Sequence, residues 1–111
     1  MPSLSELEVF ALTGIVASGE NAYAVPIFEE VEKLVETSRE LSLASLYVTL
    51  DRLQKKGFVR SWYSEPLKER GGRSRRYFEL SASGTKALKE ALLPMRRTLR
   101  VLNSFVKEST Q

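Results

Sequence analysis

At Gly57 the spacing of apolar residues changes from the three- and four-residue steps of a helix to the dense β-forming run of a strand. Two runs rich in β-branched and aromatic residues follow, at 58–63 and 76–80. A polar stretch of about a dozen residues, which contains the pair Gly71-Gly72, joins them. The sequence therefore predicts one antiparallel β-hairpin with a long tip, in a chain whose other patterns are helical.

Two helices are expected near the N-terminus. The first runs to about Ser18 behind a capping box of Ser3 and Glu6, and Gly19 ends it. The second tolerates Pro26 in its first turn, where amides have no partner in the helix. Its expected apolar face is Val25, Phe28, Val31, Leu34 and Val35, and its expected solvated face is Glu29, Glu30, Glu32, Lys33 and Glu36.

A third helix is predicted between an N-cap at Ser42 and Gly57. Its apolar back consists of Leu43, Leu46, Tyr47, Leu50 and Leu53. Its front is polar and basic, with Ser45, Thr49, Arg52, Lys55 and Lys56. Such a helix can pack on a core with one side while it offers hydroxyls and cations to a partner with the other.

Ser81 is expected to cap a final helix. Apolar residues recur along that helix with the spacing of a coiled-coil seam: Leu88, Leu92, Met95, Leu99, Leu102 and Val106. The preceding elements already suffice for one core, so we assign this stripe to a two-fold homodimer interface. The alternative is that the helix folds back on its own domain. Pro94 removes one helical hydrogen bond, so a kink or a split is expected there.

The composition leaves an enzyme without its usual parts. The chain of 111 residues has no histidine and no cysteine, so it lacks the common general base, the common transition-metal ligands and a thiol nucleophile. The glutamates of the second helix lie on a solvated face, and Gly71-Gly72 opens a strand instead of the helix that a phosphate loop requires. We therefore expect no catalytic residue, no metal site and no cofactor.

Charge is segregated along the chain. Residues 1–40 carry eight glutamates against two basic residues, whereas residues 41–111 carry fifteen basic residues against six acidic ones, within a net charge of +3. A basic half of this kind suits a polyanion. No window has the pattern of a signal peptide or a membrane span, so we expect a soluble cytoplasmic protein.

Three helices followed by a hairpin with an arginine-rich tip are in the order of a winged helix-turn-helix domain, a mainly α fold with a two-stranded β-hairpin (α-α-α-β-β-α). In that fold the third helix enters the major groove of double-stranded DNA, and the hairpin, or wing, lies on the backbone or in the minor groove. The helix residues expected at DNA are Ser42, Ser45, Tyr47, Thr49, Arg52 and Lys55, and the wing residues are Lys68, Arg70, Arg73, Arg75 and Arg76. Asp51 would repel phosphate and is expected to pair locally.

Two stretches resemble the PadR-like transcriptional regulators. In 42–59, a serine and the pair Leu46-Tyr47 precede a leucine repeat and a closing Gly-Phe-Val. In 71–84, Gly-Gly-Arg precedes the β-run, which ends in Leu80-Ser81 with Gly84 three residues on. The likeness covers residues 4–92, and Val48 stands where family members often have proline.

The resemblance implies a dimeric bacterial or archaeal repressor that binds a palindromic operator. It also implies a division into a DNA-binding domain at 1–80 and a dimerisation helix at 81–111, within one compact unit. Two alternatives stay open: a protein-interaction module that uses the acidic helices, and a sensor with a small-molecule effector at the dimer interface. Some small members hold flat drugs between aromatic side chains of that helix, where this chain has only Phe105.

Overall fold

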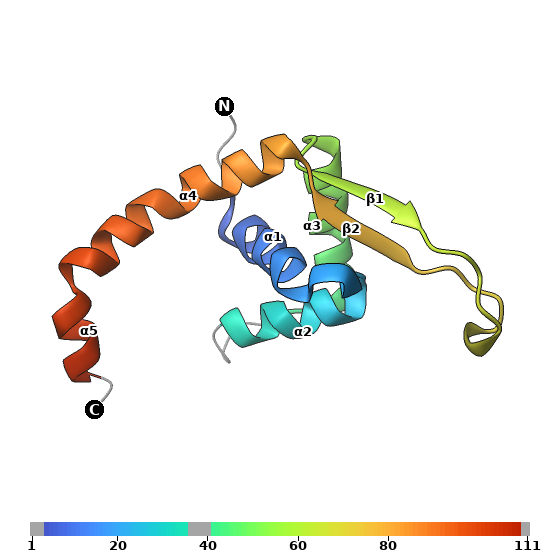
Figure 1. Ribbon diagram of the computed structural model, residues 1–111, viewed down its shortest axis with the longest axis horizontal. Helices are drawn as coiled ribbons and strands as arrows, with labels where there is room; N and C mark the ends of the chain where they lie inside the picture. Colours follow the sequence, from blue (N-terminus) through green and yellow to red (C-terminus); the bar gives the residue numbers. More distant parts are fainter. Residues whose placement is uncertain (1–3, 36–40, 110–111) are drawn as a thin grey trace.

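The computed structural model describes residues 4–35 and 41–109, without the side chains of Arg70, Glu108 and Ser109. The elements are α1 (Glu6–Ser18), α2 (Ala24–Leu34), α3 (Leu43–Lys55), β1 (Val59–Tyr63), β2 (Arg76–Leu80), α4 (Ala82–Val101) and α5 (Asn103–Ser109), with short 3-10 turns η1 (Gly19–Asn21) and η2 (Lys68–Arg70). The first three helices form a compact body, from which the hairpin and α4 extend in opposite directions (Figure 1). The predicted mainly helical winged fold is confirmed.

The helices α1 to α4 and both strands all contribute to one hydrophobic core. The buried side chains include Leu12, Ile15, Ile27, Val31, Leu46, Leu50, Leu53, Phe58, Val59, Phe78 and Leu88. Phe78 is the largest of the fully buried side chains, and it brings the base of the wing into contact with the helices. Leu88 brings the first half of α4 into contact with the same core. The N-terminal end of the predicted dimer seam therefore packs within its own chain.

The hairpin is joined to the start of α2 as well as to itself. β1 and β2 pair antiparallel in the register from Val59 opposite Leu80 to Tyr63 opposite Arg76. Tyr77 also forms a β-bridge with Tyr23, and the Phe78 amide donates to the Ala22 carbonyl at 2.8 Å. These backbone bonds fix the base of the wing against the segment that leads into α2.

The capping box of α1 lies two residues later than the sequence pattern predicted. The Ser5 side chain accepts from the Glu8 amide at 3.2 Å, and the Glu8 carboxylate accepts from the Ser5 amide at 2.8 Å. Glu8 also accepts from the Lys56 ammonium group at 2.6 Å, which gives this register a partner that local spacing does not reveal. The predicted cap Ser3 lies outside the described residues, as does Glu36 of the predicted acidic face.

The buried ion pair of Glu8 and Lys56 joins the start of α1 to the end of α3. The Glu8 side chain is 2% exposed, and burial alone would raise its pKa. The Lys56 ammonium group and the Ser5 amide outweigh burial, so the pKa of Glu8 is lowered from its ordinary value of 4.5. The pair therefore contributes its stabilisation fully above that ordinary value and loses it as pH falls through the lower folded value.

We expect Glu8→Gln to reduce the free energy of unfolding at pH 7 by about 2 kcal/mol, because Lys56 then loses its charged partner. The difference from wild type should shrink as pH falls below about 4.5, because Glu8 takes up a proton there in the unfolded chain and, at lower pH, in the folded protein as well. Urea unfolding at pH 7 and at pH 3 measures both values. Glu20→Gln, which removes an exposed carboxylate from η1, is the control, and a deficit for Glu8→Gln that does not change with pH would contradict this account.

The buried face of α2 is rotated from the one predicted. Ile27 and Val31 are fully buried and Phe28 packs against the core, whereas Val25 and Leu34 are exposed. Ala24 takes the buried position that the prediction gave to Val25, directly after the N-cap Tyr23, and Ile27 is buried beside Phe28. Pro26 lies in the first turn, as predicted.

The split predicted near Pro94 falls two turns further on. α4 continues through Pro94 and ends at Val101, and at its C-cap Leu102 the backbone leaves the helical region with φ −96° and ψ 10° before α5 begins. Pro94 therefore costs one hydrogen bond without ending the helix. In the ranges that the structure describes, no helix is long and apolar enough to cross a bilayer.

Candidate nucleic-acid interface

The N-terminus of α3 is held by two of the serines that were expected at DNA. The Ser42 side chain accepts from the Ser45 amide at 3.0 Å, and the Ser45 side chain accepts from the Ser42 amide at 3.3 Å. The Ser45 hydroxyl also donates to the Ser42 carbonyl at 2.8 Å. Ser42 is the N-cap that the sequence predicted, and both hydroxyls serve the helix start before any partner binds.

Thr49 does not lie on the outward face of α3, and the prediction that it does is wrong. Its side chain is 2% exposed, and its hydroxyl donates to the Ser45 carbonyl at 2.9 Å. That internal hydrogen bond lets a polar residue occupy a core position without leaving a buried group unpaired. The same inward turn of Thr49 moves Leu43 and Tyr47 outward, and each of them is 40% exposed.

The exposed side of α3 carries Tyr47, Val48, Asp51, Arg52 and Lys55. Asp51 pairs with Arg76 of β2 at 3.0 Å, as its predicted local pairing requires. Arg52 and Lys55, in the last turns of the helix, are exposed cations. The basic front expected from the sequence is therefore confined to the C-terminal half of α3, and the N-terminal half is apolar.

Arg76 joins the wing to α3. Its guanidinium donates to the Asp51 carboxylate at 3.0 Å, the Gln54 side-chain oxygen at 2.8 Å and the Ser61 hydroxyl at 3.2 Å, and it lies over the Phe78 ring. Its side chain is 22% exposed. Arg76 was expected at DNA, and three of its five N–H donors already bond to α3 and β1, so it also holds the wing to α3.

Arg75 faces the start of α2. Its guanidinium carbon lies 4.3 Å from the centre of the Tyr23 ring, a cation–π contact that uses the flat face and leaves the edge donors free for another partner. The Tyr23 ring meets Tyr77 edge-on at 5.6 Å, and Tyr77 stacks on Trp62 at 6.1 Å. Trp62 and Tyr77 thus pack in the hairpin, as predicted, and hold Arg75 and Tyr23 in place.

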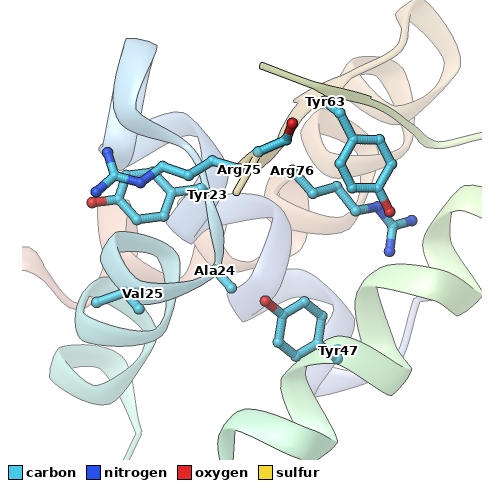
Figure 2. A pocket seen from close by; sticks show the side chains of 8 residues that line it. Tyr23, Ala24, Val25, Tyr47, Tyr63, Arg75 and Arg76 are labelled. Carbon is cyan, nitrogen blue, oxygen red and sulfur yellow. The ribbon is translucent and has the colours of Figure 1, made fainter. Parts of the chain in front are cut away.

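An open pocket of about 320 Å³ lies between the start of α2, α3 and the wing. Tyr23, Tyr47, Tyr63 and Arg75 line it, together with Ala24, Val25, Ser74 and Arg76. Tyr47 points its hydroxyl toward the start of α2, and Tyr63 approaches from the opposite side (Figure 2). Sequence reasoning missed Tyr23 and Tyr63, and the available signals were their positions directly before a helix and at the end of a β-run.

The wing tip carries the remaining predicted cations. Its strands continue one pair beyond β1 and β2, where the Ser64 amide donates to the Arg75 carbonyl at 2.8 Å. Lys68 and Arg73 are exposed beyond this point, and the side chain of Arg70 is outside the description. Gly71 and Gly72 have φ of 64° and 78°, which allows the tight turn that returns the chain.

The apolar stripe of α4 and α5 changes character along its length. Leu88 is buried and Leu92 packs against the core, whereas Met95, Leu99, Leu102 and Val106 are exposed. The exposed part lies beyond the compact body, along the arm at the left of Figure 1. The four distal residues of the predicted seam are therefore the ones most exposed to a second molecule.

Comparison with known proteins agrees with this geometry. Residues 14–90 match the model of the "Transcriptional regulator PadR-like family". A PadR family regulator from Clostridium difficile is 23% identical, with 92% of this chain and 99% of that chain covered and a TM-score of 0.68. A PadR-like regulator from Bacillus cereus is 21% identical, with 95% and 91% covered and a TM-score of 0.60.

The same fold occurs within a larger protein. The Aeropyrum pernix Orc1 protein, solved in complex with DNA, is 24% identical with a TM-score of 0.64, and the match covers 89% of this chain and 26% of that one. No curated protein matches the chain significantly. The family model spans more than half of the sequence and includes α3 and both strands of the wing. The chain therefore belongs to the PadR-like family of transcriptional regulators, which bind DNA.

Proposed function

We propose that this regulator is a homodimeric repressor that binds a palindromic operator, with α3 in the major groove and the wing on the backbone or in the minor groove. The observation that carries the proposal is the convergence of three tyrosines and Arg75 on one open pocket beside α3. Hydroxyl and guanidinium donors of this kind fix a protein on DNA phosphates. Orc1, a protein of similar fold, was solved with DNA bound.

The pocket between α2, α3 and the wing is the proposed seat of one backbone phosphate. The N-cap of α2 is Tyr23, whose side chain does not cap the helix, and Pro26 has no N–H, so the amides of Ala24 and Val25 are the ones that can serve a ligand. An anion at this point also meets the positive end of the helix dipole. With Arg75 and Tyr47 beside it, a phosphate there would hold α3 at a fixed depth in the groove.

The exposed stripe of α4 and α5 is the proposed dimer contact, which would make the last part of the chain a dimerisation segment and residues 1–80 the DNA-binding part. Four apolar side chains follow one another there without a cover among the described residues. A two-fold dimer presents two copies of α3, and an operator with matching two-fold symmetry follows from that arrangement. Membership of the PadR-like regulators, whose resemblance implied a repressor, supports the proposed negative sign of regulation and a site of action in the cytoplasm.

Selection of bound sites from random duplex DNA tests the proposal, and a two-fold symmetric consensus is the expected result. On that operator, Arg73→Ala with Arg75→Ala should weaken binding and make the plot of log affinity against log salt shallower by about 2 per protomer, since each lost phosphate contact removes about 0.9. Fluorescence anisotropy titrations from low to high salt measure the slope.

The matched control removes the same charge far from the wing. Lys33→Ala with Lys86→Ala takes two exposed cations from α2 and α4, and the salt slope should stay that of the wild type. Equal slopes for the two double variants would contradict a wing on phosphates. Failure of the selection to enrich any sequence would reject a specific operator, and transcription that rises when protein is added to an operator-bearing template would reject repression.

A further inference from the structure

The N-terminal half of α3 presents an apolar surface to the side on which the proposed DNA contact lies. Val48 is 56% exposed, Leu43 and Tyr47 are each 40% exposed, and Ala44 is exposed as well. Apolar side chains scattered singly on a surface need no explanation, but four within two turns of one helix form a patch. We define the methyl patch as Ala44 and Val48, which stand one turn apart on the same face.

Three of the side-chain hydroxyls on this half of α3 already take part in hydrogen bonds within the helix. The hydroxyls of Ser42 and Ser45 close the helix cap, and the hydroxyl of Thr49 bonds to the Ser45 carbonyl. Within the described residues 42–50, the exposed hydroxyls are those of Ser42, at the cap, and of Tyr47, which points toward the start of α2 and lines the open pocket (Figure 2). Beyond the cap, this half of α3 therefore offers base edges mainly apolar side chains.

The surroundings of the methyl patch are cationic, which indicates the kind of partner. Arg52 and Lys55 follow it along α3, and Arg75 lies across the pocket that Tyr47 shares. A protein partner would have to cover these cations together with the valine. DNA offers phosphates to the cations and an apolar group to the valine in the same groove. The major groove has one apolar group, the 5-methyl of thymine, and apolar side chains contact it.

We propose that Val48, supported by Ala44, is a specificity-determining residue that reads thymine methyl groups in the operator. The two residues are separated by about 6 Å along the helix, which corresponds to nearly two base-pair steps of about 3.4 Å. Each half-site therefore carries thymine beneath Val48, and a second thymine lies within two base pairs of the first. This inference rests on the proposed binding of α3 in the major groove.

Replacement of thymine by deoxyuridine tests the inference, because deoxyuridine lacks only the methyl group and keeps every hydrogen bond of the base. In the operator obtained by selection, each thymine is replaced in turn, symmetrically in both half-sites, and affinity is measured by anisotropy. For the wild type we expect one replacement to weaken binding about three- to tenfold per half-site. For Val48→Ala the same replacement should change affinity less than twofold, because the contacting methyl groups are gone.

Val101→Ala is the matched control, since Val101 is another helical valine and is 83% exposed, away from the wing and α3. It should respond to deoxyuridine as the wild type does. If no deoxyuridine replacement weakens tight operator binding, or if the same replacement weakens Val48→Ala and wild type equally, the methyl readout is wrong while the proposed function stands. Absence of any sequence-specific DNA binding would overturn the proposed function, and the inference with it.

Discussion

Replacement of both Leu99 and Leu102 by glutamate is expected to convert the protein to a monomer and to weaken operator binding by about a hundredfold or more. Both side chains belong to the exposed half of the α4–α5 stripe, and Leu99 is 57% exposed in the single chain. Four carboxylates brought together across a two-fold axis would repel one another and would have to lose water. Two linked half-sites gain about 10² to 10⁴ in affinity from being bound together, and a monomer forfeits that gain.

Sedimentation velocity measures the dimer, and anisotropy on full and half operators measures the binding. The control is Val101→Glu, which adds one carboxylate per protomer, half the charge of the double variant, to the same helix turn at a side chain that is off the stripe. Circular dichroism should be unchanged for all variants, because none of these residues belongs to the core. A Leu99→Glu, Leu102→Glu protein that sediments as a dimer would locate the contact elsewhere.

Gly84→Ala is expected to lower the free energy of unfolding by about 3 kcal/mol, although alanine is the better helix former by about 1 kcal/mol. A Cβ atom at Gly84 would lie 1.9 Å from the carbonyl oxygen of Phe58, a backbone atom that cannot rotate away. That carbonyl is held by the Ser81 amide at 3.0 Å, and the Ser81 hydroxyl donates to the Gly57 carbonyl at 2.6 Å. The start of α4 cannot retreat without losing these bonds.

Thermal and urea unfolding measure the change, and Lys86→Ala is the control at an exposed position of the same helix. Lys86→Ala should leave the free energy of unfolding nearly unchanged, whereas Gly84→Ala should lower it strongly. An increase in stability for Gly84→Ala would mean that helix propensity decides at this position, and that α4 docks less closely than the contact at Phe58 requires.

The elements of the wing and the recognition helix could be predicted because their signals are local. Gly57 and Ser81 bound the hairpin, Ser42 caps α3, and each of these residues has the predicted place in the structure. The roles of Thr49 and Arg76 could not be predicted from spacing. Thr49 is buried by the packing of α3 on the core, with its hydroxyl satisfied by the Ser45 carbonyl, and Arg76 reaches partners more than fourteen residues away in the sequence.

The same distinction explains the misplaced cap and the rotated face of α2. Ser3 and Ser5 are each followed three residues later by a glutamate, so local spacing does not decide which serine is the N-cap. Ser5 is the N-cap because its glutamate, Glu8, also bonds to Lys56, 48 residues later. In α2, Tyr23 pairs with Tyr77 of the wing and so fixes where the helix starts. Both outcomes depend on long-range partners, which a pattern of apolar residues does not contain.

The base of the wing is bonded to the helices, and the tip extends away from them (Figure 1). A change at the tip can therefore alter DNA affinity without altering the fold. The base is joined to α2 by the Tyr23–Tyr77 bridge and to α3 by Arg76, whereas the described side chains from 65 to 74 are exposed and outside the core. The tip is thus an exchangeable segment, and loops of other length or charge can be grafted between Ser64 and Arg75. Such grafts are expected to change the affinity for DNA while the helical core stays the same.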